Sequence, residues 1–268
     1  MKYSYLSNTG VQVSRVCLGT MTFGKEADEK TSVALMDKAL EHGINFLDTA
    51  NIYNKGLTEE IVGRWLGPHR NDVVLASKAH FPTGDGVNER GSSRRHIMMA
   101  VEASLKRLKT DWLDMLYLHH WDEYTAVDES FAAMATLVEQ GKLRYAAVSN
   151  FSAWQTMKTL AVCERRGYPR PVALQPMYNL VKRQAEVEIL PMAQSENVAV
   201  CPYSPIAAGL LTGKYLSEES GRIRENDMYS KRYGEAMYFE VARQFAAFAA
   251  KGGYSPAALA AAWTLGHP

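Results

Sequence analysis

Cysteine is scarce in this sequence, with three residues among 268, at Cys17, Cys163 and Cys201. An odd number of widely spaced cysteines, with no Cys-x-x-Cys pair, excludes a fold built on disulfides. All three lie among apolar neighbours, so we expect them to be buried, unreactive thiols.

An excess of charge and a long hydrophobic run are also missing. The sequence has 30 Lys and Arg against 29 Asp and Glu, a net charge of +1, so no bulk attraction to nucleic acid or an anionic membrane is expected. No apolar run approaches the ~18 residues of a membrane helix, and residues 1–10 lack the apolar core of a signal peptide. We therefore expect a cytoplasmic protein with no nucleic-acid or membrane partner. A hydrophobic content of 47% excludes global disorder.

Short apolar runs alternate with amphipathic segments along the chain. Most of the runs are solidly apolar, which is typical of parallel strands buried on both faces. The predicted strands are residues 15–18, 45–48, 73–78, 113–119, 145–149, 172–175 and 198–204.

The intervening segments carry helix signals. One begins with a serine N-cap at Ser92 or Ser93 and has apolar residues at helical spacing from Ile97 to Leu108. Another ends before Gly141, where a glycine C-cap belongs. Because strands and helices alternate without a break in composition, we expect one parallel α/β domain over residues 1–268.

The last residues of the predicted strands favour a barrel over an open sheet. From the second strand onward they are all polar: Asp48, Lys78, His119, Ser149, Gln175 and Ser204. In an α/β barrel the strands end on one face, which holds the active site. An open doubly wound sheet would carry a Gly-x-Gly-x-x-Gly turn, but Gly91 follows Gly84 and Gly86 two residues too late. We therefore predict a barrel.

Four side chains near three successive strand ends have complementary chemistry. Asp48, Lys78 and His119 end strands, and Tyr53 follows Asp48 in the same loop. A phenol, with a pKa of about 10, donates a proton poorly at neutral pH unless a nearby charge stabilises its anion. The Lys78 ammonium would do so, and the Asp48 carboxylate would hold that ammonium in place. Each residue alone is more often structural, but together at the ends of one barrel they indicate a catalytic site.

Six segments of the chain resemble those of aldo-keto reductases. They are Gly19-Thr-Met-Thr-Phe-Gly24, Gly43-Ile-Asn-Phe-Leu-Asp-Thr-Ala50, Asn51-Ile-Tyr53, Gly141-Lys-Leu-Arg-Tyr-Ala-Ala-Val-Ser-Asn150, Gln175-Pro-Met-Tyr-Asn179 and Tyr203-Ser-Pro-Ile. The resemblance covers nearly the whole chain and implies an α/β fold of the (β/α)8 TIM-barrel type. It also implies a catalytic tetrad of Asp48, Tyr53, Lys78 and His119, with Tyr53 as the proton donor.

The resemblance selects His119 rather than its neighbour His120. The family's histidine falls five residues after the aspartate that opens its strand, which is Asp114 here. His120 then aligns with a variable position of the substrate loop, followed by Trp121. Adjacent histidines point to opposite faces of a strand and no cysteine or carboxylate cluster accompanies them, so we expect no metal site.

A nicotinamide cofactor follows from the same resemblance, NADPH by family preference with NADH as the alternative. The residues that match the family's cofactor site, besides Asp48, are Gly19, Thr20, Met21, Ser149, Asn150, Gln175, Tyr203, Ser204, Pro205, Ile206, Ala207, Ala208, Gly209, Lys214, Arg222 and Arg224. Ser149, Asn150 and Gln175 resemble the set that grips the carboxamide, and Tyr203 resembles the aromatic that stacks on the nicotinamide ring.

The segment from Ser204 to Lys214 resembles the loop that folds over the cofactor's pyrophosphate. Small residues there let the backbone approach the phosphates, and Lys214 supplies a point charge. Arg222 or Arg224 would clamp the far side. Family members continue past the position of Pro268 with an eighth strand, a phosphate-binding segment and a closing helix. We therefore expect residues 1–268 to form a barrel domain that lacks its eighth strand and closing helix.

Together these features predict an NAD(P)H-dependent enzyme that reduces an aldehyde or ketone to an alcohol. A small-molecule carbonyl substrate is expected, and the oligomeric state is not predicted. One alternative is a cofactor-sensing binding module similar to the potassium-channel β subunits of the family. A second alternative is a barrel aldolase that forms a Schiff base through Lys78.

Overall fold

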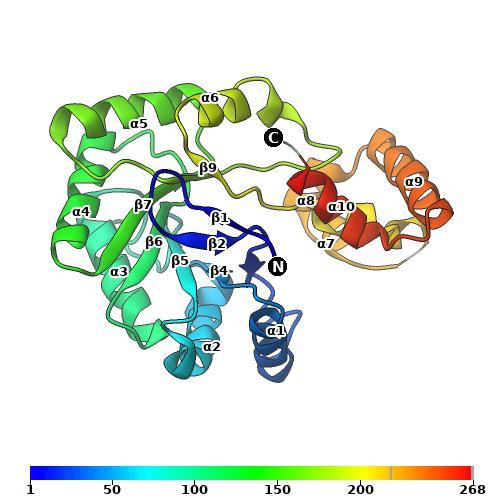
Figure 1. Ribbon diagram of the computed structural model, residues 1–268, viewed down its shortest axis with the longest axis horizontal. Coiled ribbons are helices and arrows are strands. Elements are labelled where there is room, and N and C mark those ends of the chain that lie inside the picture. Colours follow the sequence, from blue (N-terminus) through cyan, green and yellow to red (C-terminus); the bar gives the residue numbers. More distant parts are fainter. Residues whose placement is uncertain (218, 267–268) are drawn as a thin grey trace. The chain divides into compact units, whose positions relative to one another are not determined.

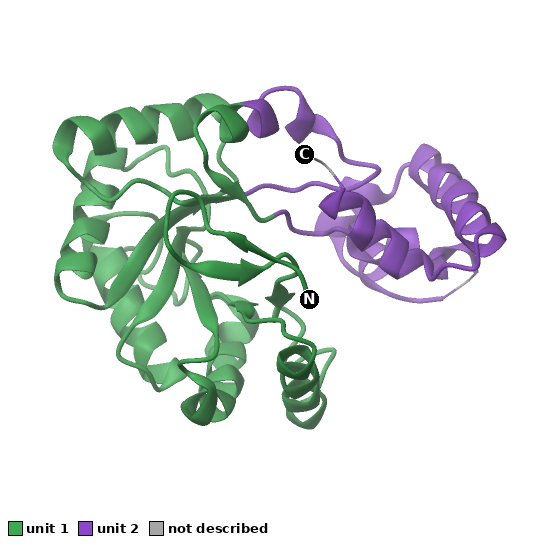
Figure 2. Ribbon diagram, in the orientation of Figure 1, with its two compact units in different colours: residues 1–174, 192–201 green, residues 175–191, 202–268 purple. Residues whose placement is uncertain are grey.

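The computed structural model describes residues 1–217 and 219–266. The chain forms two compact units. Unit 1 contains residues 1–174 and 192–201, and unit 2 contains residues 175–191 and 202–268 (Figure 2). Each unit is described by itself below. The single domain expected over residues 1–268 stays a prediction.

Unit 1 is built on a seven-stranded sheet whose spatial order follows the chain order (Figure 1). The strands are β3 (Leu18–Gly19), β4 (Phe46–Asp48), β5 (Val74–Ala79), β6 (Leu113–Leu118), β7 (Leu143–Ser149), β8 (Ala173–Gln175) and β9 (Ala199–Val200). A doubly wound sheet reverses its strand order at one point. No reversal occurs here, so each parallel crossover adds a strand on the same side, as in a barrel.

The strands agree with the sequence-based prediction in the middle of the sheet and differ at its edges. β5 and β6 are buried along almost their full length, as expected of strands that are covered on both faces of a parallel sheet. The first edge strand covers Leu18–Gly19 rather than residues 15–18, and the other edge strand stops at Val200 rather than residue 204. An edge strand has one hydrogen-bonding neighbour instead of two, so the apolar run alone does not determine its length.

Helices α1 to α5 lie around the outside of this sheet (Figure 1). They are α1 (Glu29–Glu41), α2 (Leu57–Leu66), α3 (Arg94–Leu108), α4 (Val127–Glu139) and α5 (Ala153–Arg166), with short 3-10 turns η1 (Tyr53–Gly56) and η2 (Gly67–His69); α6 (Ile189–Ser195) includes residues of both units. The predicted N-cap of α3 is Ser93, whose side chain accepts from the His96 N–H. Gly141 follows α4 with a left-handed φ of 72°, as its C-terminal position predicts.

Helix α2 packs tightly on α3 at Gly63. A Cβ atom at this position would lie 2.2 Å from the carbonyl oxygen of Arg107 and 2.7 Å from the backbone of Leu108. Alanine normally stabilises a helix interior by about 1 kcal/mol relative to glycine. Here we expect Gly63→Ala to lower the free energy of unfolding by about 1–3 kcal/mol, because the two helices must move apart. Chemical denaturation of the purified variant measures this change.

Gly67, one helical turn further on, provides the matched control. Apart from its chain neighbours, a Cβ atom there meets nothing within 4 Å. Alanine gains helix propensity at Gly67, but its Cβ would crowd the ring of Pro68, because a helical residue before proline is disfavoured. Since these two effects oppose each other, we expect Gly67→Ala to change stability by less than about 1 kcal/mol. A Gly63→Ala protein as stable as the Gly67→Ala protein would contradict the close approach of α2 and α3.

A hairpin that the sequence did not predict lies at the amino ends of the strands. Strands β1 (Tyr3–Tyr5) and β2 (Gln12–Ser14) pair antiparallel. Asn45, which precedes β4, accepts from the Ser14 N–H at 2.7 Å and donates to the carbonyl of Gln12 at 3.1 Å. The hairpin is thus fixed at the edge of the sheet opposite to the carboxyl ends, where chemistry is expected.

Unit 2 is largely helical. Its elements are η3 (Gln184–Glu186), η4 (Ala207–Thr212), η5 (Lys214–Leu216), α7 (Arg222–Glu225), α8 (Asp227–Tyr233), α9 (Ala236–Lys251) and α10 (Pro256–Leu265). Its core gathers around η4, where Leu210 and Leu211 pack with Tyr215, Tyr233 and Ala242. In the described part of the chain, no helix has the length and apolar character that crossing a membrane requires.

The cysteines agree with the expectation of unreactive thiols. Cys163 is buried as expected, whereas Cys17 and Cys201 are only half-buried and pack against the apolar interior of unit 1. Burial raises the pKa of all three thiols, that of Cys163 to about 12 and that of Cys201 to about 11. Little thiolate is therefore available for nucleophilic or redox chemistry at neutral pH.

Candidate active site

The carboxyl ends of β4, β5 and β6 bring four predicted side chains together in unit 1. Asp48 ends β4, Lys78 is the second-last residue of β5, and His119 directly follows β6. Tyr53 begins the turn η1 in the loop after β4. Parallel pairing of β4 with β5 and of β5 with β6 sets these residues beside one another, although they lie up to 71 positions apart in sequence.

The Lys78 ammonium is fully buried and joins the other groups. Its Nζ atom donates to the Asp48 carboxylate, to the carbonyl of Thr49 at 2.8 Å and to the hydroxyl of Tyr53 at 3.2 Å. Burial alone would lower the pKa of Lys78, but the attraction of Asp48 and Tyr53 and their hydrogen bonds raise it above its ordinary value. Lys78 is therefore a permanent cation beside the phenol at neutral pH.

A strained turn presents the Tyr53 side chain. Asn54 and Lys55, which follow it, both have left-handed backbones with φ of 47° and 55°, and Gly56 has φ of 93°. Consecutive left-handed residues other than glycine cost free energy and cluster at functional sites. The Asn54 side chain donates to the carbonyl of Gly24 at 2.5 Å, which holds the turn in this conformation.

The His119 imidazole is buried and neutral. Its ring lies edge-on to that of Tyr53, with 6.0 Å between the centroids. Burial first, and then the positive charge of Lys78, lowers the pKa of His119 well below its ordinary value. Its buried Nδ1 atom has no hydrogen-bond partner among the described residues. An unpaired N–H is costlier to bury than a lone pair, so the single proton belongs on Nε2.

Several of the predicted cofactor residues of unit 1 adjoin this group. Thr20 is buried, and both its N–H and its hydroxyl donate to the carbonyl of Asp48, at 2.9 and 3.0 Å. Asn150 donates from Nδ2 to the carbonyl of His119 at 2.9 Å and to the hydroxyl of Ser149 at 3.1 Å. Gly19 pairs with Asp48 in the sheet, whereas Met21 is exposed.

The other predicted cofactor residues belong to unit 2. Gln175 ends β8 and is buried, and the Tyr203 N–H donates to the carbonyl of Pro176 at 3.0 Å. The loop that begins at Ser204 contains a cluster of left-handed residues: Ser204, Ala207, Ala208, Gly209 and Gly213. Glycine has no Cβ atom, so it adopts such a left-handed backbone without strain.

Lys214 and the two arginines differ in what surrounds them. Among the described residues, no carboxylate lies within 4.0 Å of the Lys214 ammonium, which is near the φ-positive residues Gly209 and Gly221. Arg224 donates to the carbonyls of Ser217 at 2.8 Å and Glu219 at 3.0 Å. Arg224 thus stabilises the loop that precedes it. The guanidinium carbon of Arg222 lies 5.8 Å from the centroid of the Tyr229 ring.

Sequence reasoning missed the residue that anchors the loop after Ser204. Asn179 is fully buried and donates from Nδ2 to the carbonyl of Ser204 at 2.9 Å and to the hydroxyl of Tyr233 at 3.1 Å. Its Oδ1 accepts from the N–H groups of Val181 and Lys182. The signal was present in the motif Gln175-Pro-Met-Tyr-Asn179, but its partner Tyr233 lies 54 residues away.

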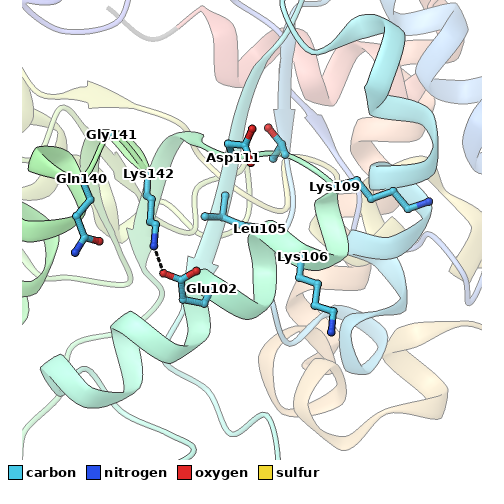
Figure 3. A pocket seen from close by; sticks show the side chains of 9 residues that line it. Glu102, Leu105, Lys106, Lys109, Asp111, Gln140, Gly141 and Lys142 are labelled. Atoms are coloured by element: carbon cyan, nitrogen blue, oxygen red, sulfur yellow. Dashed lines mark hydrogen bonds and ion pairs between the residues drawn. The ribbon is translucent and has the colours of Figure 1, made fainter.

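A prominent hollow on unit 1 does not coincide with these residues. It has a volume of about 570 Å³ and lies between α3 and the amino ends of β6 and β7 (Figure 3). Lys142 and Glu102 form an ion pair on its wall, and Lys106 and Lys109 project from α3 and its end. The hollow is therefore at the opposite ends of the strands from Asp48 and Lys78.

Over residues 1–217 and 219–266, no group of three metal-ligating side chains is found.

Comparison with known proteins places the chain in a family. A sequence model described as the aldo/keto reductase family matches residues 15–268. The uncharacterized oxidoreductase YrpG of Bacillus subtilis (strain 168) is 41% identical over 281 residues, covering 100% of this chain and 84% of the relative. An Arabidopsis thaliana protein named as a probable voltage-gated potassium channel subunit beta is 34% identical, with 100% and 84% covered. Versiconal hemiacetal acetate reductase of Aspergillus parasiticus is 34% identical, with 100% and 86% covered. The chain therefore belongs to the aldo/keto reductase family and is an oxidoreductase.

Proposed function

We propose that the protein reduces an aldehyde or ketone to an alcohol, using NADPH as the hydride source and Tyr53 as the proton donor. The observation that carries this proposal is the buried Lys78 ammonium, which donates to both the Asp48 carboxylate and the Tyr53 hydroxyl. Relatives whose printed names are oxidoreductase and reductase support the same reaction type.

The residues present fit a dinucleotide. Ser149 and Asn150 adjoin His119 and offer a hydroxyl and an amide, which match the donors and acceptors of a carboxamide. In unit 2, the loop from Ser204 to Gly213 contains five left-handed residues and leads to the Lys214 ammonium, which suits phosphate groups. The resemblance to the family, taken residue by residue, assigns Ser149, Asn150, Gln175 and Tyr203 to the nicotinamide end and Lys214 to the pyrophosphate. The chemistry that a reduced nicotinamide supplies when bound is a hydride for the carbonyl carbon.

In this scheme the tetrad supplies the proton to the carbonyl oxygen. Tyr53 donates its phenolic proton to the carbonyl oxygen of the substrate, so the O–H bond of Tyr53 breaks, an O–H bond forms on the substrate and a phenolate remains on Tyr53. Lys78 lowers the cost of the phenolate that remains, because its positive charge lies 3.2 Å from the hydroxyl oxygen. Asp48 keeps the ammonium charged and oriented.

His119 positions the substrate in this scheme. A neutral imidazole whose proton is on Nε2 can donate a hydrogen bond to the substrate oxygen without competing to transfer a proton. Its low pKa, caused by burial and by Lys78, keeps it neutral throughout the physiological range. His119 is therefore a donor that orients the carbonyl, and Tyr53 is the acid.

Two measurements test the proposal directly. Fluorescence titration with NADPH and with NADH shows whether the protein binds either dinucleotide and which one it prefers. Loss of NADPH absorbance in the presence of an aldehyde shows turnover. A protein that binds neither dinucleotide would contradict the proposed cofactor, and one that binds without turnover would favour the alternative function of a cofactor-sensing module. The relative named as a potassium channel subunit beta makes that alternative specific.

Lys214→Met should weaken dinucleotide binding about tenfold or more, because a hydrogen bond to a charged group contributes roughly 1.5–3 kcal/mol. The rate of the chemical step at saturating NADPH should change much less. Stopped-flow measurement of single turnovers separates the two effects.

Lys251→Met is the matched control for Lys214→Met. It removes the same charge from the exposed end of α9 in the same unit. The dissociation constant for NADPH should stay close to that of the wild type in this control. Equal dissociation constants in the Lys214→Met and Lys251→Met proteins would contradict a phosphate-binding role for Lys214.

A further inference from the structure

A carboxylate that has no part in the proposed chemistry is buried in the helix that follows Tyr53. Glu59 lies in the first turn of α2, and its side chain is fully buried. Its Oε1 atom accepts from the Ser77 hydroxyl at 2.6 Å, and its Oε2 atom accepts from Nε of Arg107 at 2.8 Å and from Nη2 at 2.7 Å. Because a buried ion pair is often no more stabilising than apolar residues of the same size, stability alone does not account for it.

Through Ser77, Glu59 contacts the strand that carries Lys78. Ser77 and Lys78 are consecutive residues of β5, so their side chains point to opposite faces of the sheet. The Lys78 side chain reaches Asp48 and Tyr53, whereas that of Ser77 reaches α2. Both are fully buried. The hydrogen bond between Glu59 and Ser77 therefore fixes the start of α2 against β5 at the residue before Lys78.

Through Arg107, Glu59 also supports the turn that presents Tyr53. Arg107 lies in the last turn of α3 and packs against Gly56, the last residue of η1. A Cβ atom at Gly56 would lie 2.9 Å from Cδ and 3.1 Å from Nε of Arg107. The guanidinium also donates to the Ser104 hydroxyl at 3.3 Å. The turn η1 thus packs on a side chain whose position Glu59 determines.

The other side of the turn is held by neutral groups. Asn54 donates to the carbonyl of Gly24 at 2.5 Å, and the buried Thr58 hydroxyl donates to the carbonyl of Phe23 at 2.9 Å. These bonds join the turn to the loop after β3, whereas the contacts of Glu59 join it to β5 and α3. The place of the turn relative to β5 therefore depends on Glu59.

We propose that Glu59 and Arg107 are positioning residues for the proton donor. Together they set the separation between the Tyr53 hydroxyl and the Lys78 ammonium, which is 3.2 Å. A phenolate on Tyr53 is stabilised less as this separation grows, because the attraction between opposite charges falls with distance. The inference rests on the proposed function, in which Tyr53 donates the proton.

Ultraviolet titration of Tyr53 tests this proposal without requiring turnover. The difference in tyrosinate absorbance between a protein and its Tyr53→Phe counterpart isolates Tyr53 among the 14 tyrosines. Glu59→Gln keeps the size of the side chain but weakens its contact with Arg107, which is partly exposed and can be hydrated. The phenol should then lie further from Lys78, so we expect the pKa of Tyr53 to rise, with a proton affinity about three- to tenfold higher.

The direction of this shift separates geometry from charge. Loss of the Glu59 carboxylate charge by itself would favour the phenolate and lower the pKa of Tyr53. The groups that face Tyr53, the Lys78 ammonium and the neutral His119 ring, are unchanged in Glu59→Gln. A rise in pKa therefore reports a movement of the phenol. Ser77→Ala, which removes one hydrogen bond and no charge, should shift the pKa in the same direction by a smaller factor, and it provides the test if Glu59→Gln does not fold.

Asp114→Asn is the matched control. Asp114 accepts from Arg70 at 2.8 Å and from the Leu75 N–H at 2.9 Å, so it also pairs with an arginine and contacts β5. This pair lies at the amino ends of β5 and β6, away from the tetrad. Asp114→Asn should lower stability and leave the pKa of Tyr53 at its wild-type value. An unshifted or lowered pKa in the Glu59 and Ser77 variants, or an equal rise in Asp114→Asn, would overturn the proposal.

Steady-state kinetics separate this proposal from the proposed function. In Glu59→Gln, kcat for aldehyde reduction should fall about three- to tenfold and its alkaline limb should move to higher pH, because Tyr53 becomes a weaker acid. The dissociation constant for NADPH should not change. If the wild-type protein reduces no aldehyde, the reductase function fails while the titration still decides the positioning role. If it reduces aldehydes and Tyr53 titrates alike in Glu59→Gln and the wild type, only the positioning role fails.

Discussion

We expect Tyr53→Phe to slow carbonyl reduction by about 10²–10⁴-fold, the usual contribution of general acid catalysis. Phenylalanine keeps the ring and its edge contact with His119, but it removes the hydroxyl that Lys78 approaches to 3.2 Å. NADPH affinity should hardly change, because the phenol is assigned to the substrate oxygen. Steady-state reduction of an aldehyde and fluorescence titration with NADPH measure the two quantities in parallel.

Tyr117→Phe is the control for this prediction. Tyr117 lies on β6 opposite Lys78 in the sheet register and presents its ring to the same ammonium, with 5.7 Å from Nζ to the centroid. If proximity of a phenol to Lys78 were sufficient, both variants would lose activity. We expect Tyr117→Phe to reduce aldehydes at close to the wild-type rate. Full activity in Tyr53→Phe would refute the tetrad.

Lys78→Met should abolish reduction and also destabilise the protein. Without the ammonium the phenolate of Tyr53 loses its stabilising charge, so the rate should fall by at least about 10²-fold. The Asp48 carboxylate would remain buried without its partner, which typically costs about 3–5 kcal/mol. Steady-state assays and urea denaturation measure the two losses.

The double variant Asp48→Asn/Lys78→Met distinguishes the two losses. Removing both charges of a buried pair leaves no uncompensated ion, so we expect this protein to regain much of the stability that Lys78→Met loses, but none of the activity.

The sign of the pH dependence of stability provides a further check. Because the pKa of Lys78 is raised in the folded state, its contribution to stability is complete below the ordinary lysine pKa and disappears as the pH rises through the raised value. This alkaline loss should be absent from the double variant.

The surroundings of the same lysine favour the reductase over the aldolase alternative. A Schiff-base lysine attacks a carbonyl as the neutral amine, so it requires a lowered pKa. Lys78 has a raised pKa and three hydrogen-bond acceptors around its ammonium. Borohydride treatment with an aldehyde should leave the mass of the wild-type protein unchanged at this residue. A borohydride-stable adduct on Lys78 that disappears in Lys78→Met would favour the aldolase.

The sequence alone was sufficient to predict the parallel sheet and the type of fold. Solidly apolar runs that end in polar residues predicted the buried parallel strands β4 to β8, and their central positions are confirmed. The barrel prediction agrees with the chain-order sheet and with family membership. These features can be predicted from local patterns, because a hydrophobic run and a helix cap each consist of residues that are close together in the sequence. The proximity of Asp48, Lys78 and His119 followed from the same strand ends once a parallel sheet was assumed.

The tertiary structure alone decided the contacts between residues distant in sequence. The left-handed backbone at Asn54 depends on the carbonyl of Gly24, and the anchor of the loop after Ser204 depends on Tyr233. The short edge strands and the amino-terminal hairpin depend on which chain segments lie beside them. In each case a weak local preference is settled by a hydrogen bond to a distant group, and such a bond leaves no periodic signal in the sequence.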